Sequence, residues 1–211
     1  MLKTVYEVLK MEPTKELFGT LQNAYDYFNE HLFGSELPPC MVIIHRKRNA
    51  HGYFWGEQFN NESDKKLDEI ALNPETMDRP NNVLFSTLVH EMCHLWQHHF
   101  GKVSRRGYHN KQWANKMEEV GLMPSVTGKP DGKKTGQRVT HYIIDSGAYE
   151  KIFNQWQGQT FDKWFTKPQM KKAVAQTSKQ KFTCPDCQQN AWAKPSASLV
   201  CGDCNQPMEI N

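Results

Sequence analysis

The stretch LVHEMCHLWQHHF, Leu88 to Phe100, places four histidines and one glutamate inside an apolar-rich run. Its centre, HEMCH at residues 90–94, fits the pattern H-E-x-x-H, in which two histidines one helical turn apart bind zinc and the glutamate acts as a general base. Asn81 and Asn82 are suitable N-caps before this run and Gly101 follows it, which predicts a helix over 83–100. The sequence therefore predicts a metal-binding helix at the centre of the chain.

The helical wheel and the chemistry of zinc both support this interpretation. His90, Glu91 and His94 share a face that lies away from the apolar sector of the helix, although an ordinary amphipathic helix also places polar residues there. Neutral imidazole is a good zinc ligand, and a catalytic zinc keeps three protein ligands and one position for water. A carboxylate beside that water can accept its proton. The pattern assigns His90 and His94 to a catalytic zinc and Glu91 to the general base.

The third ligand has to come from elsewhere in the chain. A ligand six residues after His94, as in one large branch of zinc proteases, would be Phe100, which cannot bind a metal. Glu118 or Glu119 lies at the distance used by a second branch, and His109 opens the next predicted helix. Spacing alone leaves these candidates open.

Three other histidines receive different interpretations. His98 and His99, near the helix end, are interpreted as exposed residues that interact favourably with the helix dipole rather than as metal ligands. His141 is interpreted as a hydrogen-bonded structural histidine in a strand, with a role beside the cleft left open.

The chain as a whole is predicted to be an α+β protein. With 211 residues, 38% of them hydrophobic, it is long enough for one domain of ordinary size and a small second module. Residues 126–137 are rich in glycine and lysine and should form a loop. Periodicity and turn residues predict helices over 14–33, 83–100, 110–120 and 149–165, and strands over 40–46, 52–55, 69–72 and 139–144.

Six cysteines divide into a cluster of four and two single residues. CPDC at 184–187 and CGDC at 201–204 are typical of a zinc ribbon, in which Cys184, Cys187, Cys201 and Cys204 complete a closed, structural zinc site. Cys40 and Cys93 are interpreted as buried structural residues. No apolar run is long enough to span a bilayer and no signal-peptide core opens the chain, so a cytoplasmic location, no membrane partner and no disulfide framework are expected.

The run from Ser86 to Leu122, STLVHEMCHLWQHHFGKVSRRGYHNKQWANKMEEVGL, resembles the SprT-like metalloprotease family, which includes the bacterial SprT proteins and the Spartan proteases of DNA–protein crosslink repair. In that family a third histidine in a G-x-H or G-H context opens the next helix, which matches Gly107-Tyr108-His109. Similar segments are ALNP at 71–74, GYF at 52–54 and GQRVTHYI at 136–143. The long C-terminal tail of the eukaryotic Spartan proteins is missing, so their regulation by ubiquitin or replication factors is not carried over.

The resemblance implies a zincin-like metalloprotease domain with a small mixed sheet, in which His90, His94 and His109 hold zinc and Glu91 is the catalytic base. It also implies that the segment around residues 69–72 is a sheet edge that pairs with an extended substrate peptide. The predicted organisation is a metalloprotease domain over 14–165, a basic linker over 166–181 and a four-cysteine zinc ribbon over 182–211. Two zinc ions are expected, one catalytic and one structural.

Two roles are open for the ribbon on its residues alone. It could be a folding unit whose apolar side is covered by Phe182 and Trp192, or a nucleic-acid contact in which Trp192 stacks on an unpaired base. In the second case phosphates would meet Lys179, Lys181 and Lys194, with Arg105 and Arg106 adding charge near the cleft. The net charge of +3 is too small to name a partner. The family resemblance favours DNA, which Spartan proteins engage in single-stranded form, and the sequence leaves the preference for single or double strands open.

The sequence therefore predicts a zinc endopeptidase that cleaves DNA-bound or DNA-crosslinked proteins. One alternative is a general cytoplasmic zinc protease that is not linked to DNA. The other is a non-catalytic DNA-binding or regulatory zinc protein, although the intact Glu91 disfavours it. The oligomeric state and the natural substrate cannot be read from the sequence.

Overall fold

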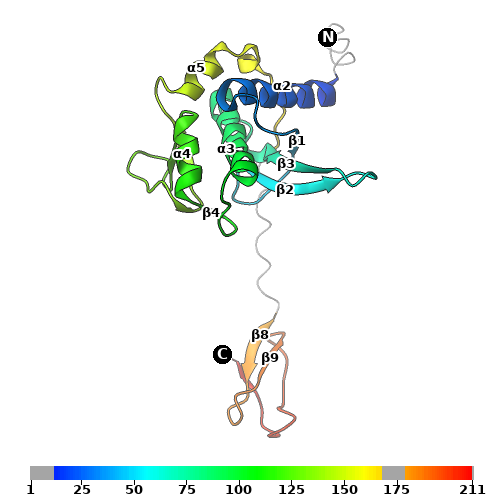
Figure 1. Cartoon of the computed structure of the whole chain (residues 1–211). Coiled ribbons are helices and arrows are strands. Elements are labelled where there is room, and N and C mark those ends of the chain that lie inside the picture. Colours follow the sequence, from blue (N-terminus) through cyan, green and yellow to red (C-terminus); the bar gives the residue numbers. More distant parts are fainter. Residues whose placement is uncertain (1–11, 168–178, 211) are drawn as a thin grey trace. The chain divides into compact units, whose positions relative to one another are not determined.

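The computed structural model describes residues 12–167 and 179–210, which fall into two separate compact units (Figure 1). Most of the predicted basic linker, residues 168–178, lies outside the described residues. Within the described ranges, no helix combines the length and the apolar character that crossing a bilayer requires. The chain is an α+β protein, as the sequence predicts.

Helix α2, Pro13–Phe33, opens the first unit and supplies one wall of its core. Pro13 is at the first turn, where its missing N–H costs nothing, and Gly34 ends the helix with a left-handed φ of 62°. The apolar stripe predicted from the sequence is buried, with Tyr25 and Phe28 almost fully enclosed. Phe28 contacts Phe85 of the predicted metal-binding helix, so α2 packs against that helix.

Three strands form a small mixed sheet in the order β1-β3-β2. Strand β1, Cys40–Ile44, runs parallel to β3, Lys66–Leu72, and β2, Gly52–Asn60, runs antiparallel to β3 on its other side. The polar residues 61–65 connect β2 to β3. Because β3 has a partner on each side, it is the central strand, and the sequence-based prediction of residues 69–72 as a free sheet edge is wrong.

Helix α3, Asn81–Phe100, lies at the centre of the unit, and α4, Lys111–Glu119, packs beside it. The Asn110 side chain caps α4 by accepting a hydrogen bond from the Trp113 N–H. Every residue of α3 from Leu84 to Cys93 is buried, because the sheet covers one flank and α2, α4 and α5, Ala148–Gln155, cover others. The cysteines outside the cluster, Cys40 and Cys93, are both buried, as expected.

The region after α4 contains short strands that the sequence did not fully reveal. Strand β5, Leu122–Ser125, pairs with β7, Thr140–Ile143, and was not predicted. In the predicted loop, β6, Gly136–Gln137, pairs with β4, Tyr108–His109. This second pairing holds the end of the α3–α4 connection against a distant part of the chain.

The last helix of the first unit is shorter than the predicted 149–165. Helix α5, Ala148–Gln155, ends before Trp156, and a 3-10 turn follows at η2, Gln157–Thr160. Trp156 adopts an extended backbone and buries its ring edge-on against Phe85, with ring centroids 4.6 Å apart. A side chain at position 158 would collide with that ring, so the absence of one at Gly158 permits the burial of Trp156. The chain buries Trp156 here where the sequence predicts further helical turns.

The second unit contains a three-stranded antiparallel sheet in the order β10-β8-β9. Its strands are β8, Gln180–Thr183, β9, Asn190–Ala193, and β10, Glu209–Ile210. Phe182 is buried at the centre of β8. The two cysteine pairs lie in the loops of this small unit.

Candidate active site and metal centres

Three histidines from two elements meet beside α3. His90 and His94 are one turn apart on α3, and His109 comes from β4, which its pairing with β6 fixes in place. Their candidate ligand nitrogens all lie within 4.8 Å of one another, and the Nε2 atoms of His94 and His109 are 3.1 Å apart. Nitrogens bound tetrahedrally to one zinc ion at about 2.0–2.1 Å would be roughly 3.3 Å apart. The three imidazoles therefore fit a zinc ion.

Hydrogen bonds from the other ring nitrogens hold two of these histidines in position. His109 Nδ1 lies 3.3 Å from the carbonyl oxygen of Gly136, to which it can donate, so its Nε2 keeps a lone pair. His90 Nδ1 lies 3.0 Å from His141 Nδ1, and His141 Nε2 lies 2.9 Å from the Ser86 hydroxyl. This series of hydrogen bonds engages His90 Nδ1 and leaves His90 Nε2 available as a ligand. His141 is thus hydrogen-bonded, as expected, and its partner is a member of the candidate metal site.

Trp113 forms the packed floor of the site, which the sequence-based reasoning missed. Its ring is fully buried and contacts the rings of His90, His94 and His109 at centroid distances of 4.9, 5.0 and 4.3 Å. Its only sequence signal is its place in the first turn of the helix that follows His109. Trp113 restricts the rotamers of all three imidazoles at once, which preorganises the cluster.

Burial keeps the three imidazoles neutral. Desolvation, with smaller contributions from neighbouring histidines, lowers the pKa of His90 well below its usual value. The same causes lower the pKa of His94 to about 3, and desolvation lowers the pKa of His109. Neutral imidazoles carry the lone pairs that a metal ion requires, so the donor set is suited to a divalent transition metal.

Glu91 lies next to His90 on α3 and lines the same cleft as the three histidines. Burial raises its pKa to about 8, against smaller lowering effects of Lys47 and of the Phe54 backbone. The absence of a side chain at Gly52 brings β2 close, because a Cβ there would lie 2.8 Å from the Ala71 carbonyl oxygen and 3.3 Å from Glu91 Cγ. Glu91 is therefore a buried carboxyl group that exchanges its proton near neutral pH.

The alternative third ligands are engaged elsewhere. Glu118 accepts a hydrogen bond from Lys134 at 2.9 Å, and Glu119 accepts one from Lys116 at 2.8 Å. His109 is the residue that the fold brings to His90 and His94. The choice that spacing left open depends on the β4–β6 pairing.

A cleft of about 770 Å³ contains this cluster and opens along β2. Gly52, Tyr53, Phe54 and Trp55 line one side of it. Among the described residues, β2 pairs with β3 only, so its second edge has no strand partner and lies beside the histidines. The open sheet edge at this cleft belongs to β2 and not to β3.

The α3–α4 connection forms another part of the cleft wall and carries two arginines. The Arg105 guanidinium lies 5.3 Å from the ring centre of Tyr108, and that of Arg106 lies 5.0 Å from the ring centre of Trp55. All four side chains are exposed. The predicted basic residues therefore lie on the cleft rim, interleaved with aromatic rings.

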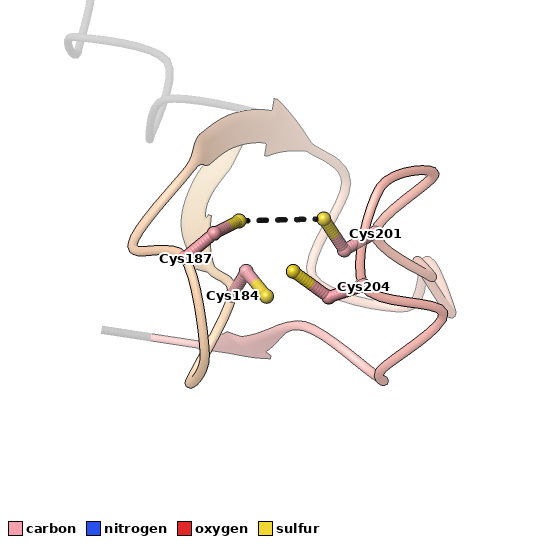
Figure 2. A group of neighbouring side chains, drawn as sticks. All are labelled: Cys184, Cys187, Cys201 and Cys204. Carbon is pink, nitrogen blue, oxygen red and sulfur yellow. Dashed lines mark hydrogen bonds between the residues drawn. The ribbon is translucent and has the colours of Figure 1, made fainter.

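The second candidate metal centre is the cysteine cluster in the C-terminal unit. The thiols of Cys184, Cys187, Cys201 and Cys204 point toward one another, as Figure 2 shows, and their sulfurs lie within 4.8 Å of one another. The Cys187 and Cys201 sulfurs are 3.6 Å apart, which is too far for a disulfide and close to the roughly 3.8 Å expected for two thiolates on one zinc. This spacing fits a closed tetrahedral site.

Two loops of the same construction present these four sulfurs. In the first loop the Cys184 N–H donates to Gln189 and the Cys184 carbonyl accepts from Gln188, and Cys201 has the matching partners Gln206 and Asn205 in the second. Gln188 and Asn205 both have a positive φ, of 61° and 54°. Backbone hydrogen bonds from Cys204 and Asp203 lower the pKa of the Cys201 thiol to about 7. These backbone hydrogen bonds therefore stabilise the thiolate of Cys201, the form that binds a metal, whereas a hydrogen bond to Cys187 raises the pKa of Cys204 to about 12.

Phe182 and Trp192, which the sequence grouped as a possible apolar cover, have different environments. Phe182 is buried, whereas Trp192 is 62% exposed. Trp192 is the register partner of Lys181 on the neighbouring strand, so the two side chains share one face of the sheet. Lys179 and Lys194 lie just outside the ends of these two strands, and both are exposed. The structure thus places two of the six predicted nucleic-acid residues, Lys181 and Trp192, on one face of this sheet.

Comparison with known proteins identifies the family. The model of the SprT-like family matches residues 21–138, more than half of the chain and all of the His90–His109 cluster. A relative described as an uncharacterized protein in the mucB 3' region of Salmonella typhimurium is 46% identical over 59 residues, which are 28% of this chain and 80% of the relative. No solved structure matches. On the match over more than half of its length, the chain belongs to the SprT-like family.

Proposed function

We propose that this chain is a zinc-dependent endopeptidase that cleaves proteins bound or crosslinked to DNA. The observation that carries the proposal is the convergence of His90, His94 and His109 with Glu91 in one cleft that runs beside an open sheet edge. Membership of the SprT-like family supports the same chemistry.

Zinc held by the three histidines would supply a Lewis acid that polarises the scissile carbonyl and acidifies a water molecule. Glu91 accepts the proton of the attacking water and then delivers it to the leaving amine. In the metal-free protein burial raises the pKa of Glu91 to about 8, and a zinc ion beside it would lower that pKa, which favours the carboxylate that accepts the proton. His141 and the Gly136 carbonyl keep the rings of His90 and His109 in the orientation that the metal needs.

The substrate would bind as an added strand on β2. Main-chain groups of an extended peptide can hydrogen-bond to the edge of Gly52–Trp55 that has no strand partner, which would place a peptide bond in the cleft next to Glu91. Main-chain hydrogen bonds depend little on which side chains the substrate carries. A protease of this kind therefore needs another source of selectivity, and proximity on DNA would supply it.

DNA would be bound by the exposed face of the C-terminal unit. Trp192 offers a ring on which an unpaired base can stack, and Lys181 beside it can meet a phosphate. Arg105 and Arg106 on the cleft rim offer further phosphate contacts. An exposed tryptophan has no packing role of its own, so its exposure favours the contact over the folding-unit interpretation.

The first test is cleavage of a DNA-binding protein by the full chain, with and without single-stranded DNA. Wild type should cleave when DNA is present, Glu91→Gln should bind zinc but not cleave, and the exposed Glu62→Gln should behave like wild type. Cleavage by Glu91→Gln would refute the mechanism. Equal cleavage without DNA would identify a general protease, and DNA binding without cleavage a regulatory protein.

The second test addresses the DNA contact. Trp192→Ala should weaken binding to a fluorescent single-stranded oligonucleotide by about 10-fold or more, the loss expected for one stacked base. Trp164→Ala removes another exposed tryptophan, from the first unit, and should leave the affinity unchanged. Equal affinities for both variants would contradict the assignment of Trp192. The cytoplasmic location stays a prediction from the sequence.

A further inference from the structure

A second group of histidines lies at the end of α3, outside the catalytic cluster. His99 Nε2 is 2.6 Å from Asp68 Oδ2, although the two residues are 31 positions apart in the sequence. Asp68 is on β3 and only 5% exposed. Its other carboxylate oxygen, Oδ1, accepts a hydrogen bond from the Glu57 N–H at 2.7 Å. The backbone of β2 therefore fixes the orientation of this carboxylate and leaves Oδ2 directed at the helix end.

His98 completes the group from the other side. Its ring lies over Gly56, where a Cβ would approach the ring atoms to 2.7 Å, and it contacts Phe54 at a centroid distance of 5.5 Å. Any side chain at position 56 would thus displace the ring. The rings of His98 and His99 are perpendicular, with centroids 5.0 Å apart, and the candidate ligand atoms of Asp68, His98 and His99 all lie within 4.8 Å of one another.

From this geometry we propose that Asp68, His98 and His99 form an additional binding site for a first-row divalent transition metal, with zinc as the probe ion. Two imidazoles and one carboxylate are a common donor set for such ions and leave coordination positions for water. The ion would enter from the solvent side, where 34% of the His99 side chain is accessible. A modest separation of His99 from Asp68, which now share a hydrogen bond, makes room for it.

The simpler alternative is a His99–Asp68 ion pair with no metal. It accounts for the contact of these two residues, but it gives no role to the placement of His98 against Gly56 on the same side. The proposed site shares no residue with the catalytic cluster or the cysteine cluster. It therefore holds or fails independently of the proposed protease function.

The experiment is a count of zinc bound by the tag-free full chain after equilibrium dialysis against zinc, measured by elemental mass spectrometry. One ion per described cluster gives three zinc ions for wild type and two for His98→Gln or His99→Gln. Glutamine at 99 can still hydrogen-bond to Asp68, so this variant should fold, which near-ultraviolet circular dichroism checks. The exposed His31→Gln is the matched control and should keep all three ions.

The proposal is overturned if His98→Gln and His99→Gln both bind as many zinc ions as wild type. Loss of the zinc ion from the His90–His94–His109 cluster is counted separately, because His94→Ala removes that ion and leaves the Asp68 site unchanged. A chain whose histidine site binds nothing would therefore still show whether the Asp68 site is occupied.

Discussion

Replacing Glu91 by glutamine should stabilise the metal-free protein at neutral pH, even though it removes the proposed catalytic base. Burial raises the pKa of this carboxyl group from 4.5 to about 8. The folded state therefore holds a proton at pH 7 that the unfolded state has released. The stability contributed by the protonated carboxyl is fully present below pH 4.5 and is lost as the pH rises toward 8. Glutamine resembles the protonated form and does not titrate.

The size of the effect follows from the two pKa values. The interval from about pH 5.5 to about pH 7.5 lies between the two pKa values, and within it each pH unit changes the free energy of unfolding by about 1.4 kcal/mol. The advantage of Glu91→Gln over wild type should therefore grow by about 2.7 kcal/mol across this interval. The buried histidines titrate equally in both proteins and cancel in the comparison.

Urea unfolding of chelator-treated protein at these two pH values measures the effect. Glu62→Gln, at an exposed position, serves as the control and should track wild type. A difference between Glu91→Gln and wild type that does not change with pH would refute the reasoning. Adding zinc should shrink the advantage at high pH, because a nearby cation favours the ionised carboxylate and stabilises wild type alone.

Three other outcomes are expected. In the Glu91→Gln background the metal-free protein should lose stability as the pH falls below about 6.5, because burial lowers the pKa of His94 to about 3 and of His141 to about 4. The loss should be about 1.4 kcal/mol per pH unit for each buried histidine. Urea midpoints between about pH 6 and about pH 5 measure this loss, and midpoints that do not change with pH would count against it. His141→Ala should weaken zinc binding to the histidine site by about 10- to 100-fold, since it removes the hydrogen bond that orients His90, and competition with a chelator measures this loss. Cys184→Ser should remove one zinc ion and abolish amide-exchange protection in the C-terminal unit while the first unit keeps its protection, whereas protection retained in both units would show that zinc does not hold the ribbon together.

Local patterns in the sequence were sufficient for the parts of the molecule whose geometry is set within a few residues. Helix α3 occupies nearly the predicted range, because its apolar period and flanking Asn and Gly residues act over single turns. The spacing of His90 and His94 follows from the helical repeat itself. The two C-x-x-C loops converge because each is a short turn with its own backbone hydrogen bonds.

Features that depend on contacts between distant segments could not be predicted without the folded structure. Sequence spacing could not choose His109 over Glu118 or Glu119, because the choice depends on the pairing of β4 with β6. That pairing joins His109 to Gly136, 27 positions further along the chain, within a Gly/Lys-rich segment that looks like a loop. The predicted edge strand was wrong because a parallel partner, β1, covers β3, and strand order is not encoded in the local pattern of one strand.

The sequence by itself determined the H-E-x-x-H helix, the four-cysteine module and the family resemblance, since each rests on residues close together in the chain. Only the tertiary structure decided that β2 is the open edge, that Trp113 and His141 support the histidines, and that Asp68 meets His98 and His99. These contacts join segments that are distant in the sequence, and their distances depend on how the whole core packs, which no local periodicity records.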